Sequence, residues 1–142
     1  MKRREVMHST TIPILRYQDA ERAIDWLCRA FGFDVFLKVH GDRRIDHARL
    51  ILDENMVMVA SLGREGAFED LFRSPARIGG ITQAVSMVVA DPKKIYDSAR
   101  SADAKMIDDL ADSRFGGQLF SCADLESHIW VFGSHDPWKK FW

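Results

Sequence analysis

An internal repeat constrains the fold of this chain more strongly than any other feature of its sequence. Asp19 and Asp91 each stand where a helix is predicted to begin, and 72 residues separate them. The same offset aligns three further pairs, which are Gly32 with Ala104, Arg49 with Ser121, and Met58 with Trp130. A repeat of this length indicates that one supersecondary unit occurs twice.

The first copy has the order strand, helix and three strands. Asp19 is a favourable N-cap, apolar residues then recur at helical spacing, and Gly32 follows at the position that glycine favours after a helix. Runs typical of strands cover residues 10–17, 33–40, 44–52 and 56–62. In the second of these strands, alternation predicts that one face carries Phe33, Val35, Leu37 and Val39.

The second copy repeats this order. Asp91 caps a helix that has Pro92 at its first position, where proline is best tolerated, and that runs to about residue 102. Strands are predicted over residues 81–90, 105–110, 117–123 and 128–132. One copy has too little core to fold alone, so the two sheets must pack together. The predicted fold is α+β, with two tandem βαβββ modules that form curled mixed sheets around a cleft.

We expect a single domain over residues 1–142, with module one at 10–62, a linker at 63–80 and module two at 81–138. The linker has glycines at both ends and an apolar patch, and it is predicted to hold about one turn of helix. A connection this long is often functional in a compact domain. Two interpretations stay open, which are a plain linker and a lid that covers a pocket.

Composition excludes several classes of protein. The net charge of −1 gives no electrostatic reason to expect binding to nucleic acid or to an anionic membrane. The basic segment at 2–4 precedes no apolar run, so no signal peptide is predicted, and no run approaches the length of a membrane span. The two cysteines, Cys28 and Cys122, are expected to be free and buried, which favours a cytoplasmic location.

The hairpin predicted over residues 116–138 is rich in aromatic residues. Phe120, Trp130 and Phe132 lie in its strands, and His128 follows the acidic turn. These side chains are interpreted either as the wall of a binding site or as core. Three carboxylates before this hairpin are predicted to lie in a solvated loop, with a metal or acid/base cluster as the alternative, and they are Asp108, Asp109 and Asp112.

Four stretches of the chain resemble one known family. They are residues 15–33 with the first helix, residues 45–50 with 57–58, residues 88–91, and residues 123–130. In this order they resemble the vicinal oxygen chelate superfamily, which includes glyoxalase I, bleomycin-resistance proteins, fosfomycin-resistance enzymes and extradiol dioxygenases. Within the last stretch, Leu125 replaces the usual proline and Ser127 the usual glycine, so that turn is expected to be strained or altered in shape.

The resemblance implies where a metal would bind. Enzymes of the family hold a divalent ion with His, Glu or Gln from four strands. The corresponding positions here are Ile12, Met58 or Val59, Ala84 or Val85, and Val131. All are apolar, and only a methionine thioether offers a poor donor. The chain therefore resembles the metal-free bleomycin-resistance branch, and we expect no metal and no other cofactor.

The function that the resemblance implies is binding of a small organic molecule, and the catalytic residues are unknown. The candidate ligand-binding residues are His47, Arg49, Met58, Gln83, Phe120, His128 and Trp130. Arg49 gives the most specific expectation of them, because a charged side chain between apolar neighbours either faces solvent or meets an acidic ligand. The alternative is a glyoxalase-like lyase or isomerase with a displaced or partial metal site at His47, Gln83 or His128, and a purely structural dimer is a third possibility.

Relatives of this fold form dimers that complete shared clefts, so a homodimer is the expected partner. The aromatic end of the chain, over residues 136–142, is predicted either to dock on that partner or to lie on its own domain.

Overall fold

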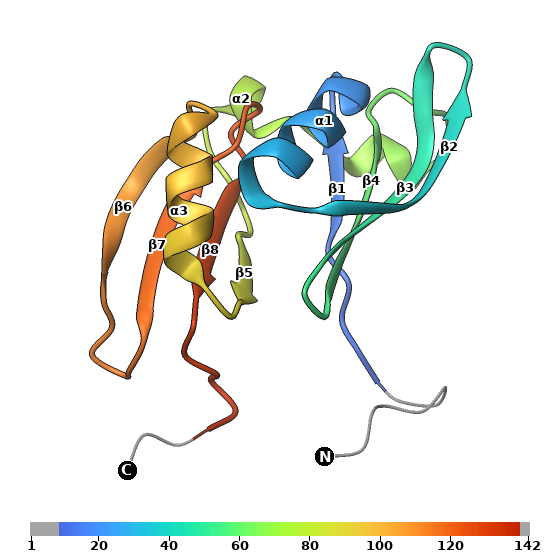
Figure 1. The fold of residues 1–142 in the computed structure, drawn as a ribbon. Coiled ribbons are helices and arrows are strands. Elements are labelled where there is room, and N and C mark those ends of the chain that lie inside the picture. Colours follow the sequence, from blue (N-terminus) through green and yellow to red (C-terminus); the bar gives the residue numbers. More distant parts are fainter. Residues whose placement is uncertain (1–8, 140–142) are drawn as a thin grey trace.

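Two four-stranded sheets and their covering helices make up this computed structural model, which describes residues 9–139 (Figure 1). The first module comprises β1 (Ile14–Tyr17), α1 (Ala20–Phe31), β2 (Asp34–Gly41), β3 (Arg44–Leu52) and β4 (Asn55–Ser61). The second comprises β5 (Val85–Val88), α3 (Pro92–Ser101), β6 (Lys105–Asp112), β7 (Gln118–Ala123) and β8 (Ile129–Gly133). Between them lie a 3₁₀ turn, η1 (Glu69–Leu71), and the short helix α2 (Pro75–Ile78).

The two sheets have the same topology. Their strand orders are β1-β4-β3-β2 and β5-β8-β7-β6. The pairs β1·β4 and β5·β8 are parallel, and the remaining neighbours are antiparallel. The predicted α+β fold of two tandem βαβββ modules is therefore confirmed.

The ends of both long helices follow from local side-chain chemistry. The Asp19 carboxylate accepts a hydrogen bond from the Arg22 amide at 3.1 Å, and Asp91 does the same for the Lys94 amide at 3.2 Å. Gly32 ends α1 with a φ of 87°, a left-handed conformation that costs glycine little. The predicted caps are confirmed.

β2 corrects the prediction of one continuous apolar face. Val35 pairs with Leu50, whereas Leu37 pairs with Arg49, and a bulge lies between the two positions. Because a bulge adds one residue, it reverses which face the following side chains take. Val35 and Leu37 therefore lie on opposite faces of the sheet.

The other strand predictions differ mainly at their ends. The strand predicted over 10–17 begins at Ile14, and the strand predicted over 81–90 is reduced to Val85–Val88. The three carboxylates are exposed, as predicted, but the prediction that they lie in a loop was wrong, because all of them lie in β6. There the Ser121 hydroxyl donates to Asp108 at 2.9 Å, and the Tyr96 hydroxyl donates to Asp109 at 3.0 Å.

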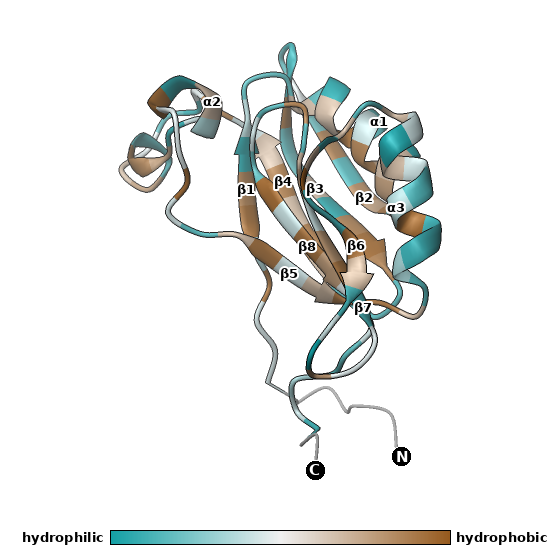
Figure 2. Cartoon of the chain, turned by 90° about the vertical axis from the view of Figure 1, so that its left-hand side faces the viewer, coloured by the Kyte–Doolittle hydropathy of each residue, from teal (hydrophilic) through white to brown (hydrophobic). Residues whose placement is uncertain are grey.

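One core joins the two modules. The helices α1 and α3 pack side by side and cover one face of the strands, while the segment that contains α2 lies on the opposite side (Figure 2). The Phe31 ring of α1 lies 5.3 Å from the Trp130 ring and 4.8 Å from the Phe132 ring of β8. The Trp26 indole donates to the Ala102 carbonyl at 2.9 Å, which ties α1 to the end of α3.

In β8 the offset between the two copies of the repeat is 73 residues and not the predicted 72. Arg49 opposes Met58 in the first sheet, and Ser121 opposes Val131 in the second. The counterpart of Met58 is therefore Val131, not Trp130, because the turn before β8 is one residue longer. Since side chains alternate along a strand, this shift moves a side chain from one face of the sheet to the other.

The final turn of each module contacts the start of the other module's helix. The Glu126 carboxylate accepts from the amides of Gln18 and Asp19 at 2.7 and 2.9 Å. In the reciprocal contact, the Asp53 carboxylate accepts from the Ala90 amide at 3.3 Å, and the Asn55 side chain donates to the Val88 carbonyl at 3.2 Å. The repeat thus produces a pair of turn-to-helix contacts.

Two predictions fall partly or wholly outside the described residues. The basic segment at 2–4 lies outside them, as do residues 140–142 of the aromatic end. Trp138, which is described, is 94% exposed. Among the helices of residues 9–139, none is long and apolar enough to cross a membrane.

Candidate functional site

Three of the predicted ligand-binding residues meet on one face of the first sheet. Arg49 of β3 is the direct cross-strand neighbour of Met58 of β4, and Met58 is paired in turn with Ile14 of β1. His47 lies two residues before Arg49 on the same strand. Their neighbours in sequence, such as Ala48 and Leu50, are buried in the core. We call this surface, defined by Ile14, Arg16, His47, Arg49 and Met58, the outer face, because it points away from α1 and α3.

Arg49 and His47 form a hydrogen-bonded pair on the outer face. The Arg49 Nε donates to His47 Nε2 at 3.0 Å, so this imidazole nitrogen is an acceptor and the ring is neutral. Burial lowers the pKa of His47, and the charges of Arg49, Arg16 and Arg64 lower it further. Within residues 9–139, no carboxylate forms an ion pair with Arg49.

A second arginine on the outer face was missed by sequence reasoning. The Arg16 guanidinium donates from Nε and Nη2 to the two Glu69 oxygens at 2.7 and 2.8 Å, and it lies 4.7 Å from the centre of the Phe72 ring. Arg16 is only 7% exposed. The signal was a charge between Leu15 and Tyr17, which is the same pattern that singled out Arg49.

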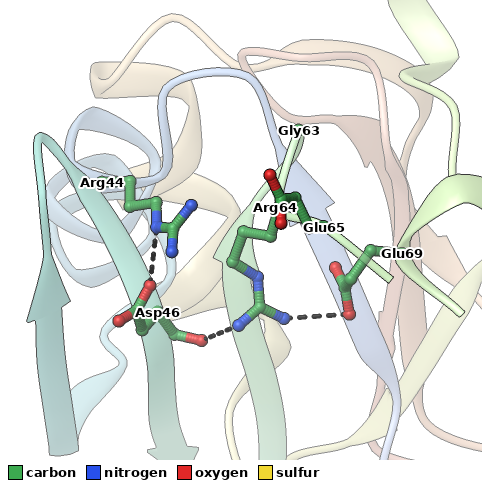
Figure 3. A pocket seen from close by; sticks show the side chains of 6 residues that line it. All are labelled: Arg44, Asp46, Gly63, Arg64, Glu65 and Glu69. Carbon is green, nitrogen blue, oxygen red and sulfur yellow. Dashed lines mark hydrogen bonds and ion pairs between the residues drawn. The ribbon is translucent and has the colours of Figure 1, made fainter. Parts of the chain in front are cut away.

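Glu69 comes from the linker, and it receives a second arginine. Arg64 follows β4 in the sequence, and its side chain bridges β3 and η1. It donates to the Asp46 carbonyl and forms an ion pair with Glu69 at 2.9 Å (Figure 3). The hydrogen bond from Arg16 is the main reason why the pKa of Glu69 falls to about 2, and Arg64 adds to it. Beside these groups is an open pocket of about 700 Å³, lined by Arg44, Asp46, Gly63, Arg64, Glu65 and Glu69.

The remaining predicted residues do not join this group. Phe120 and Trp130 are 0% exposed and belong to the core, on the face of the second sheet that packs against α1 and α3. Of the two interpretations of these aromatic residues, a site wall or the core, their burial agrees with the core. Gln83 is exposed in the segment before β5. The His128 ring bonds to the Arg16 carbonyl at 3.0 Å and lies 4.7 Å from the Tyr17 ring, so it joins the two modules.

Asp124 stabilises the turn of the last hairpin and joins it to β1. Its carboxylate is buried and accepts from the Tyr17 hydroxyl at 2.6 Å and from the Trp130 indole at 3.0 Å. The amides of Glu126 and His128 donate to its other oxygen at 2.9 and 3.0 Å. A buried carboxylate needs such donors, and here four converge on one group.

Comparison with known proteins identifies the family. A profile of the Glyoxalase/Bleomycin resistance protein/Dioxygenase superfamily matches residues 7–132. The chain belongs to this superfamily. No protein with a curated description matched it significantly.

Solved structures of the superfamily fold agree with this assignment. TioX from Micromonospora sp. ML1 is 31% identical, with a TM-score of 0.71 over 88% of this chain and 94% of that one. UcmS2 is 12% identical, with a TM-score of 0.69 over 90% and 100% of the two chains. A mutant of the fosfomycin resistance protein FosX from Listeria monocytogenes, complexed with Mn(II) and 1S,2S-dihydroxypropylphosphonic acid, is 7% identical, with a TM-score of 0.64 over 93% and 94%. The last two likenesses show the fold alone.

The side chains of one chain do not fit a metal ion of the kind that the superfamily's enzymes hold. Within the described residues, no three His, Cys, Asp or Glu side chains gather closely enough to hold one. Met58 and Val131, two of the positions that the resemblance assigns to ligands, are equivalent in the two sheets, and neither is a good donor.

Proposed function

We propose that this protein binds a small organic molecule with an acidic group on the outer face of its first sheet, without a catalytic metal. The observation that carries the proposal is Arg49. It is half-buried, its Nε hydrogen bond goes to a neutral imidazole, and no described carboxylate pairs with it. A guanidinium favours a planar, two-point contact with a carboxylate or phosphate, so an acidic ligand would satisfy it.

The surroundings of Arg49 suit an organic ligand. Leu37 and Met58 are its cross-strand neighbours, and Ile14 lies beside Met58, so apolar side chains flank the charge on both strands. Small-molecule sites combine apolar area with a few placed polar groups. His47 would be the second polar group, because its ring nitrogen Nδ1 has no hydrogen-bond partner within residues 9–139 and could donate to a ligand.

We also propose a homodimer located in the cytoplasm. Apolar side chains are exposed on both sheets, among them Leu37 and Val39 of β2, Val88 of β5, and Leu119 of β7. A second copy of the chain would cover such area and enclose the outer face. Sedimentation in the analytical ultracentrifuge tests the proposed homodimer, and a monomer at micromolar concentration would contradict the dimer.

No contact in the structure favours the alternative of a lyase or isomerase with a displaced metal site. His47 lies on the outer face, Gln83 precedes β5, and His128 is bonded to the Arg16 carbonyl. Three ligands of one ion must converge on a point, and these do not.

The test is a thermal-shift screen of small organic acids, followed by calorimetry of the compounds that stabilise the protein. Arg49→Gln should weaken their binding by about 10- to 100-fold, because a charge-assisted hydrogen bond contributes roughly 1.5–3 kcal/mol. Arg77→Gln is the control, because Arg77 is exposed on α2 and its loss changes the net charge equally. Equal losses in both variants, or none in Arg49→Gln, would disprove the proposal.

A further inference from the structure

The arginines at the outer face outnumber the carboxylates that pair with them. Arg16 and Arg64 share the single carboxylate of Glu69, and Arg49 has none among the described residues. Asp46, which lines the same pocket, directs its carboxylate to Arg44 at 2.8 Å and gives Arg64 its backbone carbonyl. The region therefore keeps an excess of positive charge.

We propose that Arg16 and Arg64 form an anion-binding site, which Glu69 of the same chain occupies until the carboxylate or phosphate group of a ligand replaces it. Residues 65–71, which carry Glu69, would then leave the outer face, while Arg64 and Phe72 stay in place. This inference rests on the proposed function in one respect, because the ligand would reach the same face of the first sheet.

Both arginines are held in place by contacts that do not involve Glu69. The Arg16 guanidinium lies over the Phe72 ring and donates to the Leu15 carbonyl at 3.4 Å. Arg64 donates to the Asp46 carbonyl of β3. Because these contacts fix one end of each guanidinium, the remaining donors stay directed at the position of the Glu69 carboxylate. A site formed in advance in this way binds an anion with little loss of side-chain freedom.

The two arginines are the main contacts that hold the Glu69 carboxylate in this position. The Glu69 side chain is 11% exposed, whereas Phe68 and Leu71 on either side of it are 54% and 78% exposed. Gly63 and Gly66 have φ values of 84° and 135°, which give the backbone before η1 conformations open mainly to glycine. An anion that pairs with the same arginines therefore competes against one carboxylate and not against a packed core.

The experiment compares Glu69→Gln with Glu65→Gln. Glu65 lines the same pocket, belongs to the same segment, and forms no ion pair within the described residues, so its loss changes the charge equally. Acetate and inorganic phosphate are titrated separately, while NMR follows the Nε–H signals of the arginine side chains. In Glu69→Gln, we expect the Arg16 signal to respond at anion concentrations at least tenfold lower than in the wild type. Glu65→Gln should match the wild type, and the two anions together show which charge the site prefers.

A second variant, Glu69→Ala, keeps the inference testable if Glu69→Gln does not fold. Glu69→Ala leaves space for a free carboxylate, so acetate should raise its melting temperature by several degrees more than that of the wild type. Adding Arg16→Lys to Glu69→Ala should abolish this rescue, because lysine keeps the charge but loses the two-point contact.

Two results would overturn the inference. One is an equal anion response in Glu69→Gln and Glu65→Gln, and the other is absence of acetate rescue in Glu69→Ala. If organic acids still bind in an Arg49-dependent way, only this inference fails. Loss of that binding as well would remove the proposed function.

Discussion

At the scale of single residues, Ser127 carries a cost that the sequence already indicated. Glycine is usual at this position in the family, and Ser127 has a φ of 72°, in the left-handed region. A side chain in that region costs roughly 1–2 kcal/mol, whereas glycine adopts it freely. The predicted strain in this turn is therefore located at one backbone position.

Ser127→Gly should raise the free energy of unfolding by about 0.5–1 kcal/mol, since the gain in the folded turn is partly offset by the flexibility of an unfolded glycine. Urea unfolding followed by tryptophan fluorescence measures it. Ser101→Gly, near the end of α3, is the control and should lower stability, because glycine is unfavourable in a helix. A lower stability of Ser127→Gly would contradict the interpretation.

Tyr17→Phe tests the buried carboxylate of Asp124. The variant removes the 2.6 Å hydrogen bond and leaves a buried charge with one donor fewer. We expect a loss of about 1.5–3 kcal/mol in the free energy of unfolding. Tyr96→Phe is the matched control, because its hydroxyl bonds to Asp109 at an exposed site and should contribute far less. Similar losses in the two variants would show that burial of Asp124 does not matter.

The two cysteines should differ in their reaction with iodoacetamide. Burial raises the pKa of the Cys122 thiol to about 12, and Asp124 adds to the effect, so almost no thiolate exists at pH 8. Burial also raises the pKa of Cys28, but this residue is only half-buried. Mass spectrometry should find slow labelling of Cys28 in the folded protein and labelling of Cys122 only after unfolding. Equal rates would contradict the burial of β7.

At the scale of elements, the ionic contact of the linker should depend on pH. The pKa of Glu69 is about 2 in the folded chain and near 4.5 without its partners. Because the folded-state value is the lower one, the stabilisation is complete above about pH 5 and is lost as the pH falls towards 2. The upper limit of this stabilisation is about 3 kcal/mol, and screening by the solvent in the open pocket beside Glu69 reduces it.

The measurement is the difference in free energy of unfolding between the wild type and Glu69→Gln from pH 7 to pH 3. We expect a difference of about 1–3 kcal/mol at pH 7 that declines steadily below about pH 5. Arg16, Arg64 and the nearby Arg49 stay charged over this range. His47, which interacts with the same arginines, takes up its proton in both proteins, so the difference between them reports mainly Glu69. A constant difference would contradict the ion pair.

Sequence patterns predicted the helices better than the strands. The caps at Asp19 and Asp91 depend on hydrogen bonds within three residues, which a local pattern contains. The bulge after Val35 depends on how β2 pairs with β3, and no local pattern specifies it. The lengths of β1 and β5 likewise depend on their parallel partners, which are distant in the sequence.

At the scale of the whole molecule, the candidate site was predicted only in part. Alternation along β3 predicted that His47 and Arg49 share a face, and the pairing of β3 with β4 places Met58 beside Arg49. Trp130 was proposed as a wall of the site from the resemblance, with core packing as the alternative, and the extra residue in the turn before β8 places it on the core face. Glu69 could not be predicted, because Arg16 is distant in the sequence and the segment that holds Arg64 and Glu69 has no periodic pattern.

The two turn-to-helix contacts differ in strength. On one side, Glu126 accepts from two amides at 2.7 and 2.9 Å beside the Asp124 carboxylate with its four donors, whereas on the other side Asp53 and Asn55 make longer hydrogen bonds of 3.3 and 3.2 Å. Local opening between the modules should therefore begin at the second contact. In hydrogen exchange, the Ala90 amide should lose protection well before the His128 amide, and any ligand that bridges the two sheets would slow this opening.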